Sequence, residues 1–333
     1  MILLHRTRNI ACILILLILT ACTPFRQQSP SLLKPDMGAY VAIDTFSDFS
    51  KFAPIFLIEE YSAVHNRIGS PAAEITQSDD EHIYVDHETP AIFVQKKSFT
   101  TETGSYANFI YRIHFKEVPL SPTRFYLTSG ANVGMLIVVT VNDSGKPVLV
   151  TSVHTCGCYL SFLPTSLLQE TAFPENWDRN AQKVYGENLP GLIDLQKNSF
   201  PDPILKMILT LRSDTHRLMD IHFAEKQAIE EQYTLIETPL RPMAHLKSLP
   251  LNNSTTSFFE ENGPRKGYVK GSYKPFERLL MSWWSFDLRV GEDKAYCPKE
   301  ETGAFYTSLK YWARKDSDMR NFPQFLKYWG WNL

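Results

Sequence analysis

Residues 135–155 read MLIVVTVNDSGKPVLVTSVHT, and this stretch decides the class of fold that the sequence predicts. Two runs rich in β-branched residues flank a segment with Asp143, Ser144 and Gly145, which are residue types that favour tight turns. The stretch therefore predicts a β-hairpin. Both runs are apolar almost throughout, which indicates strands that are covered on both faces and lie near the middle of a sheet.

Other parts of the chain repeat this strand pattern. Short runs of β-branched and aromatic residues, separated by Pro, Gly and Thr, extend from about residue 83 to the hairpin. Residues 203–213 and 215–223 predict a further strand pair. We expect an α+β fold with a mainly antiparallel central sheet and flanking helices, built as a single globular domain over residues 37–333.

Four segments predict the helices of this fold, one of them a charged helical turn at residues 224–232. Residues 47–69 carry Phe and Leu side chains at helical spacing, with Pro54 expected in the first turns, where it is best tolerated. Residues 173–188 and 322–329 have the same spacing. Five of the six tryptophans lie in the last sixty residues. Such residues could stack on the sugar rings of a glycan, but we expect them mainly in the core.

The hairpin leads directly into SVHTCGCYLSF, residues 152–162. Side chains in a strand alternate between two faces, so a strand continued to residue 158 would gather His154, Cys156 and Cys158 on one face. Imidazole with two thiolates is a ligand set that suits zinc or copper(I). The spacing therefore predicts a metal site at this end of the hairpin.

A fourth ligand is offered by SDTHRLMDIHF, residues 213–223. Read as a strand, this segment places His216, Asp220 and His222 on one face. The metal hypothesis takes His216 as the fourth ligand, with Asp220 or His222 supporting the site. It requires that this strand and the strand of Cys156 be neighbours.

Other interpretations of the cysteines stay open. An exported chain meets an oxidising compartment, where a Cys156–Cys158 disulfide would need a bend at Gly157, since two residues of a strand span about 6.6 Å. Cys297 could instead pair with either cysteine. A thiol activated by a histidine would serve redox or nucleophilic chemistry. In the simplest interpretation, the residues are buried without chemistry. The sequence therefore does not decide whether the protein is an enzyme.

The N-terminus has the features of an export signal. Basic residues precede an apolar run, Ile10–Leu19, which is too short to span a bilayer. The run ends in Leu19-Thr20-Ala21-Cys22, which resembles the lipobox of bacterial lipoproteins. The resemblance implies that residues 1–21 are a signal peptide, that cleavage follows Ala21, and that Cys22 carries a diacylglyceryl thioether and an acylated N-terminus.

This resemblance also implies a location and partners. Residues 22–36, rich in Pro, Gln and Ser, are expected to tether the folded body to the membrane through the lipid on Cys22. Thr23, where an aspartate would imply retention at the inner membrane, favours the outer membrane, with the folded body facing the periplasm. A further partner would be another envelope protein or a glycan.

Composition and charge narrow the function classes. The chain is 44% hydrophobic and 13% aromatic, which is typical of a globular protein with a sizeable core. Loss of residues 1–21 removes two arginines and no acid, so the formal charge changes from -2 to -4. The sequence has no basic stripe, so we expect no nucleic-acid partner.

Overall fold

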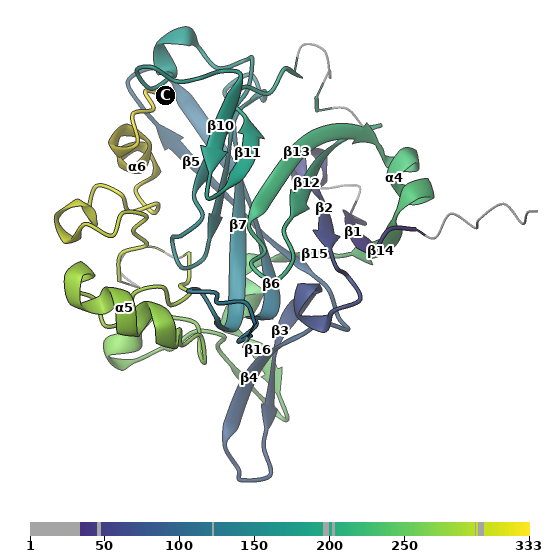
Figure 1. Cartoon of the computed structure of the whole chain (residues 1–333), viewed down its shortest axis with the longest axis vertical. Helices are drawn as coiled ribbons and strands as arrows, with labels where there is room; N and C mark the ends of the chain where they lie inside the picture. The colour runs from purple at the N-terminus through teal and green to yellow at the C-terminus, as the bar shows by residue number, and fades with distance from the viewer. Residues whose placement is uncertain are drawn as a thin grey trace, which may run out of the picture. The chain divides into compact units, whose positions relative to one another are not determined.

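The predicted hairpin forms the centre of an eight-stranded sheet in the computed structural model (Figure 1). Strand β7 (Gly130–Asn142) pairs antiparallel with β8 (Pro147–His154), and the register places Met135 opposite His154. The turn between them closes with a hydrogen bond from the Asn142 N–H to the Lys146 carbonyl. The hairpin prediction is therefore confirmed.

The remaining strands of this larger sheet extend to both sides of the hairpin. The order is β15-β5-β6-β7-β8-β9, with β3 pairing to β6 and β4 to β3, and only the β15–β5 pair is parallel. Their bounds are β3 Ile68–Ile75, β4 Glu81–Asp86, β5 Ile92–Thr100, β6 Ser105–Val118, β9 Ser161–Pro164 and β15 Leu240–Pro242.

A second sheet of five strands has the order β13-β12-β2-β1-β14. It contains the predicted pair β12 (Leu205–Leu211) and β13 (Leu218–Glu225), which is antiparallel. The β1–β14 and β2–β12 pairs are parallel. The other bounds are β1 Met37–Ala42, β2 Ile55–Glu59 and β14 Thr234–Thr238. Two small hairpins, β10 (Ala181–Val184) with β11 (Glu187–Pro190) and β16 (Leu249–Leu251) with β17 (Ser254–Thr256), complete the strands described.

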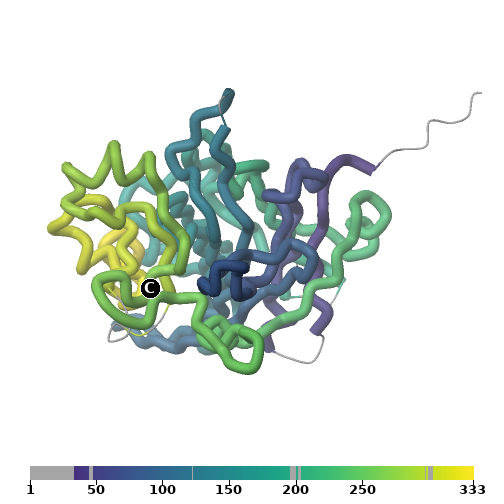
Figure 2. Tube along the Cα trace, turned by 90° about the horizontal axis from the view of Figure 1, so that it is seen from below, coloured from purple at the N-terminus to yellow at the C-terminus, as the bar shows by residue number. Residues whose placement is uncertain are grey.

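The larger sheet is covered on both faces, as its apolar strands predict. Alternate residues of β6 and β7, such as Tyr111 and Ile137, share a core with Phe56 of the smaller sheet. The intervening residues, such as Val138, share a second core with Phe325 near the C-terminus. Figures 1 and 2 accordingly show the smaller sheet and the C-terminal segment on opposite sides of the larger sheet.

Within the residues that the structure describes, the helices are few and short. They are α2 (Asp48–Phe52), α4 (Lys226–Gln232), α5 (Pro275–Ser285) and α6 (Phe322–Tyr328), with 3-10 turns at η2 (Val64–Asn66), η3 (Glu170–Ala172), η4 (Met243–Lys247), η5 (Gly263–Arg265) and η6 (Tyr311–Ala313). The helix predicted at 322–329 is present. The helix predicted over 47–69 is wrong, because α2 ends before Pro54 and β2 follows. The helix predicted over 173–188 is also wrong, because its second half forms the β10–β11 hairpin.

The structure describes residues 34–44, 48–121, 123–195, 200–201, 204–296, 298 and 303–333. Residues 36–333 form one compact unit that contains the hydrophobic cores. The lipobox, the lipidation site Cys22 and most of the predicted tether lie outside the described residues, and so does Cys297. None of the described helices is long and apolar enough to cross a membrane.

Candidate functional site

The predicted site begins where β8 ends. Strand geometry stops at His154, and residues 155–157 turn the chain back on itself. The Gly157 N–H donates to the His154 carbonyl at 2.8 Å, and the His154 N–H donates to the Cys158 carbonyl at 2.9 Å. Gly157 has φ +92°, and a Cβ atom there would lie 2.1 Å from the Tyr306 carbonyl oxygen. Only glycine fits this position, for both reasons.

Cys156 and Cys158 form a disulfide within this turn. Their Cα atoms are 5.6 Å apart, closer than in an extended strand and within the range that a disulfide accepts. The strand predicted to reach residue 158 is therefore wrong, and the alternative of a bend at Gly157 is confirmed. The Cys156 side chain is buried, whereas Cys158 is partly exposed.

His154 lies beside the disulfide and is buried. One ligand atom from each of His154, Cys156 and Cys158 lies within 4.8 Å of the others, so the three side chains could hold a metal ion. The His154 Nε2 atom lies 3.2 Å from the carbonyl oxygen of His216, to which it can donate. Burial, with the nearby Lys274 ammonium, lowers the pKa of His154 to about 4. The imidazole is therefore neutral at neutral pH.

The His216 side chain does not join this group. Its Nε2 atom lies 3.0 Å from the His65 carbonyl oxygen, and its ring stacks on Phe115 with centroids 3.8 Å apart. His65 in turn bonds to the Asp214 carboxylate at 2.8 Å. His216 thus contacts His154 through its main-chain carbonyl. Its side chain does not lie where the prediction of a fourth metal ligand requires it.

The reason is a turn where the sequence predicted a strand. The Arg212 N–H donates to the Arg217 carbonyl, and His216 has φ +55°, so β13 begins only at Leu218. Asp220 and His222 do share a face of β13 and pair at 2.8 Å. Both side chains are nearly half exposed to solvent on an edge strand, and neither is among the residues gathered at the turn.

Buried charges lie behind the turn. The Lys294 ammonium donates to the Cys156 carbonyl at 3.2 Å and to the Glu292 carbonyl at 3.1 Å. Burial lowers the pKa of Lys294 to about 8, and the Asp287 and Asp293 carboxylates oppose this effect. The sequence GEDKAY offered no sign of this burial, because a run of charged residues is typical of a solvated surface.

Asp293 fixes the turn to its surroundings. Its Oδ1 atom accepts hydrogen bonds from the Gly134 N–H at 3.1 Å and from the Thr155 hydroxyl. Its Oδ2 atom lies 3.1 Å from the Lys274 ammonium, which is also buried. Burial alone would lower the pKa of Lys274, but attraction to Asp293 and Glu277, together with the hydrogen bond to Asp293, outweighs it and raises this pKa. This ion pair therefore joins β7, the turn after β8 and the start of α5.

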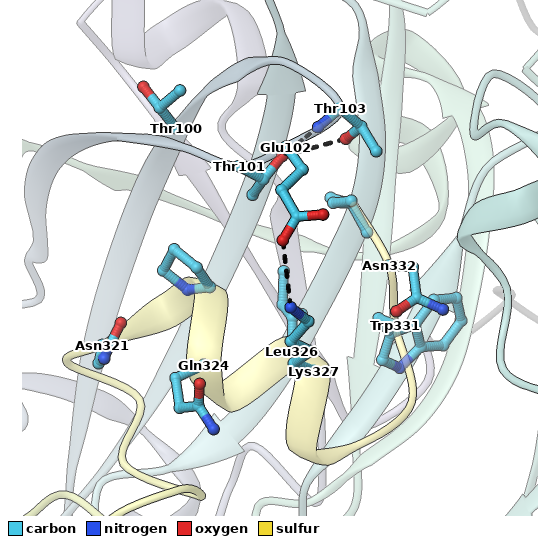
Figure 3. Close-up of a pocket in the computed structure, with 12 residues that line it drawn as sticks. Thr100, Thr101, Glu102, Thr103, Asn321, Gln324, Leu326, Lys327, Trp331 and Asn332 are labelled. Carbon is cyan, nitrogen blue, oxygen red and sulfur yellow. Dashed lines mark hydrogen bonds and ion pairs between the residues drawn. The ribbon is translucent and has the colours of Figure 1, made fainter.

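One cavity away from the turn has few charged groups. This cavity, shown in Figure 3, has a volume of about 390 Å³ and lies between the residues after β5 and the helix α6. Its charged side chains are Glu102 and Lys327, an exposed pair at 3.5 Å. None of its lining residues belongs to the turn of Cys156 and Cys158.

Comparisons with protein-family models, curated proteins and solved structures give no match to this chain. The functional argument therefore rests on its own residues.

Proposed function

We propose that the protein is a lipid-anchored component of the bacterial envelope that binds a soft metal ion, copper(I) or zinc, through His154, Cys156 and Cys158 when the two cysteines are reduced. The observation that carries the proposal is the meeting of these three ligand atoms on one turn, where His154 and Cys156 are buried and Cys158 is partly exposed. The anchor is the lipid expected on Cys22, and the body faces the periplasm.

The ligand chemistry favours a soft ion. Two thiolates with one imidazole suit copper(I), and zinc would complete a tetrahedral site with water as its fourth ligand. A ligating imidazole must be neutral, and the low pKa of His154 satisfies this condition. When its Nε2–H donates to the His216 carbonyl, Nδ1 keeps the lone pair, which is the arrangement typical of metal-binding histidines.

The disulfide is the metal-free state in this proposal. A dithiol reductant transfers two electrons and two protons to the Cys156–Cys158 bond, leaving two thiols and the oxidised reductant. Binding of the metal then releases the thiol protons. Re-formation of the disulfide removes both sulfur ligands, so the oxidation state of the pair controls metal occupancy.

A second candidate function is thiol–disulfide exchange without a metal. It is favoured by the partial exposure of Cys158, which an external thiolate can attack, and by the burial of Cys156. The Lys294 ammonium, bonded to the Cys156 carbonyl, would stabilise a thiolate on the leaving Cys156. The His-x-Cys-x-Cys turn would then be a redox pair.

Metal titration separates the two functions. Residues 23–333 carrying Cys297→Ser, which removes the other thiol, are prepared in oxidised and reduced forms. Copper(I) and zinc are then titrated against a chromophoric competing ligand. We expect one tightly bound ion per reduced chain and none per oxidised chain. His154→Gln should weaken binding by about tenfold or more. The matched control His222→Gln, on exposed β13, should not change it.

Two results would contradict the metal proposal. One is a reduced chain that takes up neither ion although both thiols react with a thiol reagent. The other is unchanged affinity in Cys156→Ser. If the chain takes no metal but equilibrates with glutathione at a defined potential, the second candidate replaces the first.

A further inference from the structure

Helix α5 has its polar and apolar sides reversed. The residues that face the protein interior include Glu277 and Ser285, both buried. The apolar side chains Leu279 and Trp283 face solvent, with exposed fractions of 72% and 74%. Gly291, with φ +78°, makes room for the Glu277 carboxylate, because a Cβ atom there would overlap it. A surface helix normally buries its apolar side, so this exposed face indicates a binding surface.

The exposed face continues beyond the helix. Phe286 and Leu288, just after α5, are 71% and 63% exposed, and Trp312 of η6 is 68% exposed. The Phe286 ring contacts Tyr311 with centroids 5.5 Å apart, and Tyr311 contacts Trp312 at 5.2 Å. We call this region the α5 surface; its residues are Leu279, Leu280, Trp283, Trp284, Phe286, Leu288, Tyr311 and Trp312.

These exposures correct the expectation that the C-terminal tryptophans lie mainly in the core. Trp331 is buried, but Trp283, Trp284 and Trp312 are exposed. Figure 1 shows α5 at the margin of the unit, on the side of the larger sheet away from β1 and β2, and Figure 2 shows the same separation from below.

A cationic cavity adjoins the α5 surface. It has a volume of about 390 Å³, and its lining includes the basic residues Lys266, Arg289 and Arg314. Its acidic residue, Asp287, already accepts hydrogen bonds from the Tyr306 hydroxyl at 2.5 Å and from the Arg289 N–H at 2.9 Å. Arg314 also donates to the Phe286 carbonyl at 3.5 Å, which places the cavity next to the exposed aromatic residues.

We propose that the α5 surface lies against an anionic phospholipid bilayer, with a lipid phosphate in the adjoining cavity. Exposed Trp and Tyr side chains beside Leu and Phe are suited to the boundary between headgroups and acyl chains. The three basic side chains complement the phosphate charge. Glu277 is buried, and the one carboxylate of the cavity, Asp287, is outnumbered by its three basic side chains, so the lining keeps a net positive charge. The contact is additional to the lipid expected on Cys22.

Vesicle flotation tests this surface without the lipid anchor. Residues 36–333, the compact unit, are mixed with vesicles of phosphatidylcholine alone or of phosphatidylethanolamine and phosphatidylglycerol in equal parts. We expect binding to the anionic vesicles, weakened by salt. Trp283→Ser should reduce binding by at least about tenfold. Lys266→Gln and Arg289→Gln should each reduce it by about fivefold, on anionic vesicles only.

The control is Ile204→Ser, which removes another exposed apolar side chain, 63% exposed, next to β12. It should bind vesicles like the unaltered chain. Circular dichroism before flotation shows that each variant is folded. The proposal is overturned if the unit binds no vesicle, or if folded Trp283→Ser binds as well as the unaltered chain. Equal binding to both vesicle types also overturns it. If the chain does not bind vesicles but forms a dimer, and Trp283→Ser dissociates that dimer, the α5 surface is instead a contact between subunits.

Discussion

Reduction of the Cys156–Cys158 bond should cost the protein little stability. The bond closes a loop of three residues, and a chain-entropy estimate gives it about 1.6 kcal/mol, against about 3 kcal/mol for a loop of fifteen residues. Two main-chain hydrogen bonds already hold the same turn. The unfolding entropy of a unit of this size is about 0.6 kcal/mol per kelvin, so the melting temperature should fall by only about 2–3 °C.

The measurement compares oxidised and reduced residues 36–333 carrying Cys297→Ser, by urea denaturation and by calorimetry. Cys156→Ser should match the reduced form in both experiments. A structural disulfide commonly contributes 2–5 kcal/mol. A loss above about 3 kcal/mol would refute the reasoning, because the bond would then be a main support of the fold and its proposed reversible opening would be untenable.

Two further predictions concern the same turn. Gly157→Ala should destabilise both redox forms by more than about 2 kcal/mol in urea denaturation, because the new Cβ meets the Tyr306 carbonyl, whereas Gly145→Ala, with φ +72° and open space, should lose only about 1 kcal/mol. His154 has a pKa of about 4 when folded and near 6.5 when unfolded, so the unfolded chain binds more protons between these values and stability falls as pH drops through that window. Between pH 7 and pH 4, the His154→Gln variant should lose less unfolding free energy than the unaltered chain, by on the order of 3 kcal/mol. An equal loss in both chains would contradict the low pKa of His154 in the folded protein.

The elements that could be predicted from the sequence are those that depend on neighbouring residues. The hairpin of residues 135–155 needs only two β-branched runs and a turn, and it is present. The β12–β13 pair follows from the same kind of pattern. The helix predicted over 47–69 failed because IFLIE fits a buried strand as well as a helix. Pairing with β1 and β12 on either side makes this segment a strand, and β12 comes from a distant part of the chain.

The site was predicted in part for a similar reason. His154, Cys156 and Cys158 are close in sequence, so they lie together in the structure even though β8 ends at His154. The position of His216 depended on where β13 begins, and a turn shifts that start to Leu218. Lys294 could not be foreseen at all. Its burial depends on contacts that form only in the folded chain, more than a hundred residues from Cys156.

These distant contacts explain how the turn could keep its shape without the disulfide. The Gly157 backbone packs against Tyr306, Lys294 holds the Cys156 carbonyl, and Asp293 holds Thr155. None of these contacts uses a sulfur atom. Reduction should therefore leave both thiols beside a neutral His154. Folding has already ordered these ligands, so binding a metal would cost little further conformational entropy. A metal ion that bound there would gain from ligands placed in advance by the fold, which is the condition a reversible redox-controlled site requires.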